Sequence, residues 1–111
     1  MASAARIEQA EEDPLRDELL ARIDQLQRDF RLLSVGELCR RADMIRHMSD
    51  AARMEVVRRL AVALRESIAA GGRGASVLPY FEGMREAIML PVQDEAMARA
   101  FLASVSVRLA G

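Results

Sequence analysis

Apolar residues recur every three or four positions along most of this 111-residue chain, and this spacing limits its fold more than any other feature. Side chains three and four apart lie on one face of an α-helix, so each repeating segment predicts an amphipathic helix. Breaks in the spacing divide the chain into five segments joined by short connections. The sequence therefore predicts an all-α fold, a single-domain bundle of about five short helices in which sequence neighbours pack largely antiparallel.

The first predicted helix begins at Asp13 and Pro14, which suit the N-cap and the first helical position. Residues 1–12 are charged and weakly periodic, so we expect a flexible or frayed N-terminal tail ahead of a helical bundle domain at 13–111. The predicted helix carries a narrow apolar seam, which packs inside a bundle or forms a homodimer contact. The seam consists of Leu19, Ile23, Leu26, Phe30 and Leu33.

Two serines predict the next helix starts. Ser34 with Glu37 has the form of a capping box and predicts a second helix over about 35–48. Ser49-Asp50 has the form of an N-cap and predicts a third helix over about 50–70. The apolar stripe of this third segment covers nearly half its circumference, which predicts the most buried helix of the set.

Glycine and proline mark the remaining connections. Gly71-Gly72 is expected to end the third helix, because glycine takes the left-handed C-cap without steric cost. The residues GGRGAS at 71–76 predict a loop, and the fourth helix, about 77–90, is expected to stop before Pro91. The fifth segment is predicted as a helix over about 93–109.

Composition favours a soluble intracellular protein. Half of the residues are hydrophobic and 30% are charged, an ordinary globular balance, and the single cysteine cannot form an internal disulfide. We find no 18-residue apolar run and no apolar stretch near the N-terminus of the kind a signal peptide needs. All sixteen basic residues are arginine, which fits a GC-rich genome. We expect a cytoplasmic protein of bacterial type.

The residue inventory argues against several kinds of chemistry. Without lysine, Schiff-base catalysis and a P-loop are excluded. The only cysteine, Cys39, and the only histidine, His47, are eight residues apart on one predicted helix, which separates them by about 12 Å of rise. One cysteine and one histidine also cannot build a thiolate–imidazole zinc site. We therefore predict no catalytic residue, no metal ligand and no cofactor, and we expect binding rather than catalysis.

Two weak resemblances to known families are present in the sequence. An exposed His47 on a helix resembles the phosphoacceptor of histidine-phosphotransfer bundles, but residues 48–52 lack that family's lysine. The segment 15–33 slightly resembles the first helix of helical chorismate mutases, but Leu20 stands where that family has an arginine. We transfer neither activity to this chain.

Charge is unevenly distributed along the chain. Residues 1–39 hold five arginines against nine acids, net −4, whereas residues 40–73 hold eight arginines against four acids, net +4. Residues 74–111 are close to neutral, at net −1. One interpretation is internal pairing, in which the acidic first helix lies beside the basic second and third helices.

The leading functional hypothesis is a regulatory or adaptor protein whose arginine-rich face binds a protein partner with an acidic surface, because arginine is favoured at interfaces. Exposed Met44, Met89 and Val62 would add apolar contact area if they cluster. A homodimer through the first-helix seam is one form of this hypothesis. The candidate partner-binding residues are Arg40, Arg41, Arg46, Arg53, Arg58 and Arg59.

Two alternatives stay open at this point. The second and third helices can be interpreted as a DNA-binding helix-turn-helix, although the chain is slightly acidic, with a pI near 5.9. An arginine-lined pocket for a small molecule, assembled between helices in three dimensions, would leave no mark in the sequence.

Overall fold

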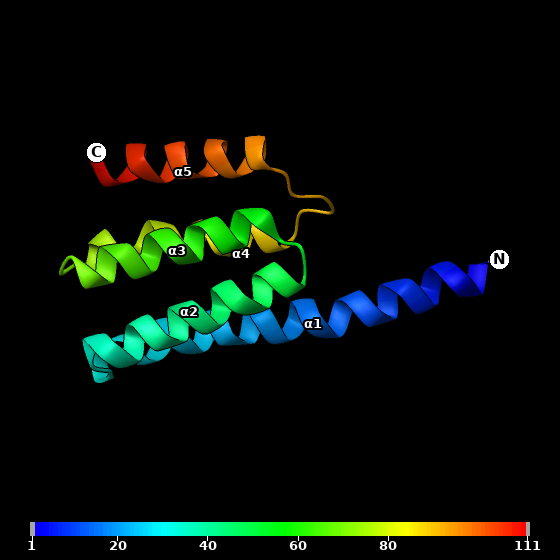
Figure 1. The fold of residues 1–111 in the computed structure, drawn as a ribbon, viewed down its shortest axis with the longest axis horizontal. Helices are drawn as coiled ribbons and strands as arrows, with labels where there is room; N and C mark the ends of the chain where they lie inside the picture. The colour runs from blue at the N-terminus through cyan, green and yellow to red at the C-terminus, as the bar shows by residue number, and fades with distance from the viewer. Residues whose placement is uncertain (1, 111) are drawn as a thin grey trace.

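The computed structural model describes residues 2–110, with side chains from residue 14 to residue 110. This part of the chain contains five α-helices and no strand, so the all-α prediction is confirmed (Figure 1). The helices are α1 (Ala2–Asp29), α2 (Val35–Ala51), α3 (Glu55–Ala69), α4 (Leu78–Ile88) and α5 (Glu95–Ala110). Two short 3₁₀ turns, η1 (Phe30–Leu32) and η2 (Gly74–Ser76), follow α1 and precede α4.

The first four helices form a ring in which each contacts the next, and α4 closes the ring against α1. Helix α5 packs on α3 and α4, outside the ring. Successive helices run in opposite directions, as predicted, and α3 and α4 lie between α5 and the α1–α2 pair (Figure 1). Helix α3 therefore touches three other helices, α2, α4 and α5.

Helix α1 begins at Ala2, so the predicted start at Asp13 is wrong. Pro14 lies inside the helix, which continues past it with one backbone hydrogen bond fewer because proline has no N–H. The prediction of a flexible or frayed tail at 1–12 concerns residues whose side chains lie outside the described part, and it stays a prediction.

The apolar seam of α1 faces the interior of the bundle. Its first four members are buried against neighbouring helices, and Leu33 is half-buried. The ring of Phe30 meets that of Phe81 on α4 edge to face, with centroids 6.0 Å apart. The prediction of a homodimer contact through Leu19, Ile23, Leu26, Phe30 and Leu33 gains no support, because the first four of these side chains are already buried within one chain.

The start of α2 is confirmed and the start of α3 is not. Ser34 Oγ accepts the backbone N–H of Glu37 at 3.2 Å. Ser49 is buried inside α2, where its hydroxyl donates to the carbonyl of Ile45 at 2.6 Å. That bond satisfies the serine within the helix, so Ser49-Asp50 is not an N-cap and α3 begins at Glu55.

Helix α3 has a wide buried face, as its apolar stripe predicts, and α4 is buried at least as fully, with six buried residues in 11 against six in 15 for α3. Between Glu55 and Ile68, only Arg65 and Glu66 are exposed. The residues of α3 that are buried in the core are Val56, Val57, Leu60, Ala61, Leu64 and Ile68.

Helices α2 and α3 end in the same backbone motif with different residues at its key position. At the end of α3, Gly71 takes φ +98° and the N–H of Gly72 bonds the carbonyl of Ser67 at 2.8 Å. At the end of α2, Arg53 takes φ +57° and the N–H of Met54 bonds the carbonyl of Ser49 at 2.8 Å. Both are Schellman-type ends, and an arginine in this left-handed conformation carries strain that glycine avoids.

We expect Arg53→Gly to stabilise the protein by about 1 kcal/mol, because glycine adopts the left-handed conformation without a Cβ clash. Urea unfolding followed by circular dichroism measures the change. The matched control is Gly71→Ala, which should lose a similar amount at the equivalent position of α3. A lower unfolding midpoint for Arg53→Gly would contradict the strain argument.

The N-terminus of α3 is capped by a residue from the α4–α5 connection. Met54, the N-cap residue of α3, makes no side-chain cap bond. Gln93 Oε1 accepts the N–H groups of Val56 and Val57 at 2.9 and 3.3 Å, and Gln93 Nε2 donates to the carbonyl of Ala87 at 2.8 Å. One amide therefore ties the start of α3 to the end of α4 and positions the connection to α5.

We expect Gln93→Ala to cost about 1–2 kcal/mol of unfolding free energy, because it leaves the N–H groups of Val56 and Val57 without this acceptor. Gln93→Glu should lose less, since a carboxylate keeps the acceptor and suits the positive end of α3. Urea midpoints of the two variants test this order. Equal stability of Gln93→Ala and the unmodified chain would show that the amide does not fix these helix ends.

Candidate functional site

The six arginines singled out in the sequence lie on α2, on the α2–α3 turn and on the first turns of α3, and most already have a carboxylate partner. Arg53 is the one member of the set that has no ion pair among the described side chains. The pairs are Arg40–Glu37, Arg41–Asp29, Arg41–Glu37, Arg46–Asp43, Arg58–Glu55, Arg59–Glu55 and Arg59–Glu95. Among the described side chains, only the Arg41–Asp29 pair joins this set to α1, so the positive run is compensated mainly by acids of its own helices.

Glu55 and Arg58 form the best-defined of these pairs. Arg58 donates to both carboxylate oxygens of Glu55, at 2.7 and 2.9 Å, on the first turn of α3. This hydrogen bonding lowers the pKa of Glu55 and raises the pKa of Arg58. A carboxylate here also suits the positive end of the helix dipole, so the pair has a structural role.

Because its folded-state pKa is depressed, Glu55 contributes stability above its unfolded pKa, and this contribution is lost as the pH falls through the folded value. The stability difference between the unmodified chain and Glu55→Gln should therefore shrink from about pH 6 to about pH 3. Urea unfolding at each pH measures it. The control is Glu66→Gln, an exposed acid without an ion pair among the described side chains. A pH-independent difference for Glu55→Gln would contradict the assignment.

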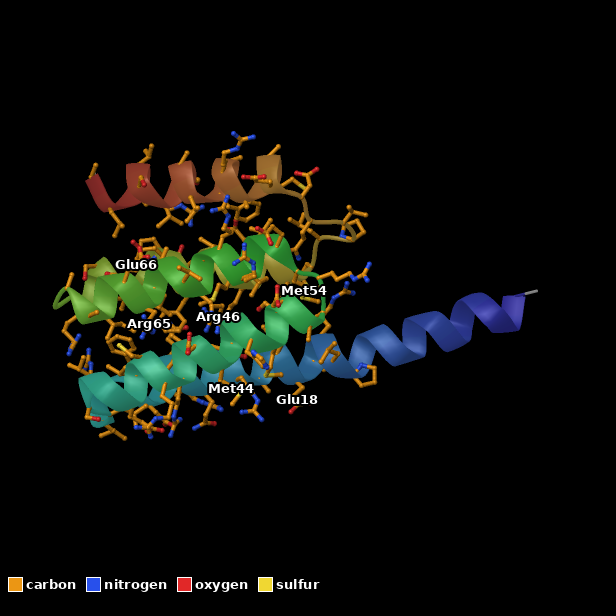
Figure 2. All side chains as sticks on the ribbon, viewed as in Figure 1. Glu18, Met44, Arg46, Met54, Arg65 and Glu66 are labelled. Atoms are coloured by element: carbon orange, nitrogen blue, oxygen red, sulfur yellow. The ribbon has the colours of Figure 1, made fainter. Side chains whose placement is uncertain are left out.

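Asp43 has two arginine neighbours on the face of α2 turned toward α3. Arg46 donates to Asp43 at 2.9 Å, and Arg65 of α3 lies 4.0 Å from the same carboxylate (Figure 2). The hydrogen bond from Arg46 is the largest cause of the lowered pKa of Asp43. Arg46 is therefore engaged between the two helices.

Cys39 and His47 lie apart, as their spacing predicts. Cys39 is half-buried and packs against the core, whereas His47 is exposed. Within residues 14–110, no group of three or more His, Cys, Asp or Glu side chains is placed to hold a metal ion.

The packing of α3 gives little support to the helix-turn-helix hypothesis. Helices α2 and α3 lie antiparallel along each other, and α3 is covered by α2, α4 and α5 (Figure 1). A recognition helix needs an open face that enters the major groove. Arg58 and Arg59, which were expected to touch DNA, are instead bound to Glu55 and Glu95.

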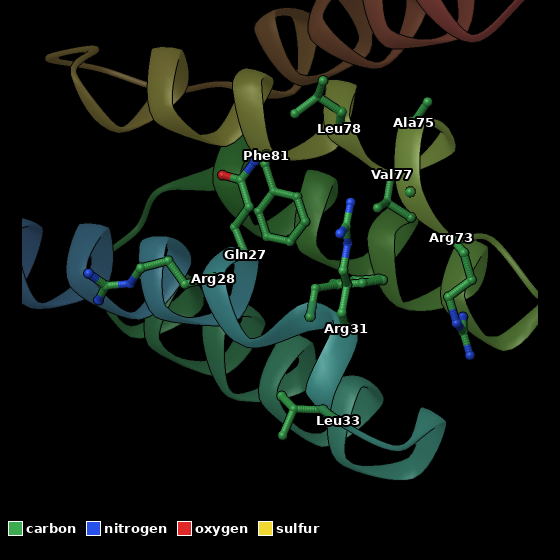
Figure 3. Close-up of a pocket in the computed structure, with 11 residues that line it drawn as sticks. Gln27, Arg28, Arg31, Leu33, Arg73, Ala75, Val77, Leu78 and Phe81 are labelled. Atoms are coloured by element: carbon green, nitrogen blue, oxygen red, sulfur yellow. The ribbon is translucent and has the colours of Figure 1, made fainter.

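A cavity of about 730 Å³ opens at the end of the bundle where α1 stops (Figure 3). The last turn of α1 and η1 form one wall, and η2 and the first turns of α4 form the other. We call it the end groove. It is lined by Gln27, Arg28, Phe30, Arg31, Leu33, Arg73, Gly74, Ala75, Val77, Leu78 and Phe81.

The lining of the end groove contains three arginines and no carboxylate. Arg28 donates to the side-chain oxygen of Gln25 at 2.8 Å, and Arg73 donates to the carbonyl of Gly72 at 2.6 Å, so both bond neutral acceptors. Arg31 has no hydrogen bond or ion pair within the described side chains and points between Phe81 and Val77 (Figure 3). Arg28 also helps to lower the pKa of Asp29, whereas Arg31 and Arg73 have no carboxylate partner among the described side chains.

Apolar side chains remain accessible at and beside the end groove. Leu78 lines it and is 42% exposed, and Leu33 lines it and is half-buried. Leu32, next to both Arg31 and Leu33 in the chain, is 84% exposed. Cationic and aliphatic groups thus stand side by side on one surface.

A second, smaller cavity of about 270 Å³ lies between α1 and α2, beside Met44 (Figure 2). Its arginines are Arg22, Arg40 and Arg41, and each has a carboxylate partner. Met44 is exposed there and Met89 is exposed after α4, as expected, whereas Val62 is half-buried. This cavity contains part of the predicted arginine face, but its charges are paired.

Charge summed over long segments does not reveal Arg28, Arg31 and Arg73 as candidate site residues. A sharper signal is present in the sequence, since Arg31 and Arg73 have no acid three or four residues away in either direction. On a helix these are the positions from which a compensating carboxylate comes. The joining of Arg31 and Arg73 at one cavity depends on the packing of α1 against α4.

No family model, curated protein or solved structure matches this chain. Among the described helices, none combines the length and the apolar composition that crossing a membrane requires.

Proposed function

We propose that this chain is a small regulatory or adaptor protein that acts by binding another protein, with the end groove as its main contact. The observation that carries the proposal is the lining of that groove, where three arginines without a carboxylate surround an apolar floor. Arginine and aromatic residues are enriched in protein interfaces, and charged groups without internal partners gain most from a complementary surface.

The arginine face predicted from the sequence stays in the proposal as a second surface. Arg40 is 76% exposed at its side chain and Arg53 has no ion pair among the described side chains. The five paired arginines, Arg40 included, would have to leave a carboxylate to meet a partner, and exchanging one ion pair for another gains little free energy. We therefore rank the end groove first and the set Arg40, Arg41, Arg46, Arg53, Arg58 and Arg59 second.

We also propose a cytoplasmic, bacterial setting, supported by the lone cysteine and by the exclusive use of arginine as the basic residue. The partner is a protein with an acidic surface. A second copy of this chain is one such candidate, and it would meet the first through a surface other than the buried seam of α1.

Affinity capture from native lysate, with and without nuclease, tests the proposal. We expect a nuclease-resistant protein partner whose recovery falls about tenfold or more for Arg31→Glu/Arg73→Glu, because like charges then face each other across the interface. The matched variant Arg40→Glu/Arg41→Glu should retain most of the partner. Mass spectrometry identifies what is bound, and recovery of this chain itself identifies a homo-oligomer.

The reverse pattern, with loss only for Arg40→Glu/Arg41→Glu, would move the contact to α2. Recovery that disappears with nuclease would favour the nucleic-acid alternative, which requires salt-sensitive duplex binding that weakens on Arg58→Ala or Arg59→Ala. We expect no duplex binding at low salt.

A further inference from the structure

The geometry of the end groove points to the chemistry of its occupant. We propose that it takes a short acidic segment of a partner protein, in which one aliphatic or aromatic anchor is flanked by Asp or Glu. This inference rests on the proposed function and adds the kind of segment that is recognised.

The apolar part of the groove has room for an anchor side chain. Its floor is already packed, because Phe30 and Phe81 stack edge to face and are 8% and 1% exposed. Accessible apolar surface comes instead from Leu33 and Leu78 on opposite walls. Figure 3 shows Leu78 and Leu33 on opposite sides of Phe81 and Arg31, so an anchor contacts one of them. An anchor laid against Leu78 removes apolar area from water, which is the driving force of hydrophobic contact.

The charged part of the groove requires carboxylates beside that anchor. Arg31 stands in the middle of the lining, with Arg28 and Arg73 toward opposite ends (Figure 3). A guanidinium pairs with a carboxylate through two parallel hydrogen bonds, so Arg31 offers a directional contact beside the apolar part of the groove. Arg28 and Arg73 then receive acids on either side of the anchor.

Helix-end electrostatics explain part of this arrangement. Arg28 and Arg31 lie near the C-terminus of α1, where cations complement the helix dipole. Arg73 lines the cavity from the other wall and donates to the carbonyls of Gly72 and Ile68 at the end of α3, at 2.6 and 3.5 Å. Arg31 has no hydrogen bond or ion pair within the described side chains, so it is the cation of this acid-free lining that a ligand would pair with.

Single-stranded nucleic acid fits this groove less well than an acidic peptide. Proteins hold unpaired bases by stacking them on accessible aromatic faces between cationic side chains. The two aromatic residues of the lining are both buried, and their rings pack on each other. The accessible apolar groups are leucines, which suit an apolar side chain better than a base.

Fluorescence anisotropy with a labelled synthetic peptide tests the inference. In the probe peptide, glutamates flank a central leucine and phenylalanine. One control peptide replaces the two anchors by serine, and the other replaces the glutamates by glutamine. We expect the probe to bind the full chain and each control peptide to bind about tenfold or more weakly, because each lacks one of the two contacts.

Variants of the protein locate the contact. Arg31→Glu should weaken probe binding about tenfold or more, and Arg31→Gln should weaken it less. Both variants lose the attraction between Arg31 and a peptide carboxylate, but only Arg31→Glu also repels that carboxylate. The matched control is Arg99→Glu, an exposed arginine of α5 outside the groove lining that has no ion pair among the described side chains. A peptide carrying lysine in place of glutamate should bind Arg31→Glu better than it binds the unmodified chain. Urea midpoints show whether each variant is folded.

Three results would overturn the inference: the probe does not bind, it binds equally without its anchors, or Arg31→Glu and Arg31→Gln leave its affinity unchanged. Competition by a single-stranded oligonucleotide as strong as by unlabelled probe would overturn it in favour of nucleic acid. If the peptide fails while lysate capture still depends on Arg31 and Arg73, the proposed function survives and only the nature of the segment is wrong.

Discussion

The burial of α3 against three other helices is the constraint on which the rest of this structure depends. Its wide apolar face contacts α2, α4 and α5, and only Arg65 and Glu66 between Glu55 and Ile68 are left exposed. Met54, the N-cap residue of α3, has no side-chain oxygen with which to cap the helix, and Gln93 caps it from the α4–α5 connection. Arg58 and Arg59 on its first turns form ion pairs with Glu55 and Glu95.

The end groove lies at the end of the bundle where α1 stops. Arg28, Arg31 and Arg73 line it, and its lining contains no carboxylate. All three arginines are exposed, so water solvates their charge. Their place beside accessible leucines is the basis on which we propose the end groove as a contact surface.

Much of the fold could be predicted from the sequence because helical periodicity is a local signal. It identified five helices, the start of α2 at Ser34 and the end of α3 at Gly71. Two predicted helix starts were wrong because a residue that can begin a helix can also lie inside one. Pro14 lies inside α1, and the buried hydroxyl of Ser49 bonds the carbonyl of Ile45 instead of capping α3. The candidate site was harder to predict: net charge ignores pairing, and the meeting of Arg31 with Arg73 depends on tertiary packing.

The position at which an acidic, apolar-anchored peptide contacts the protein tests the role of the end groove most directly. Titrating the glutamate-flanked peptide into isotope-labelled protein and recording amide chemical shifts gives this position at residue resolution. We predict shifts concentrated in residues 27–33 and 73–81, on the two walls of the end groove. Shifts concentrated in residues 40–59, or no shifts at peptide concentrations that saturate anisotropy, would contradict a contact at the end groove.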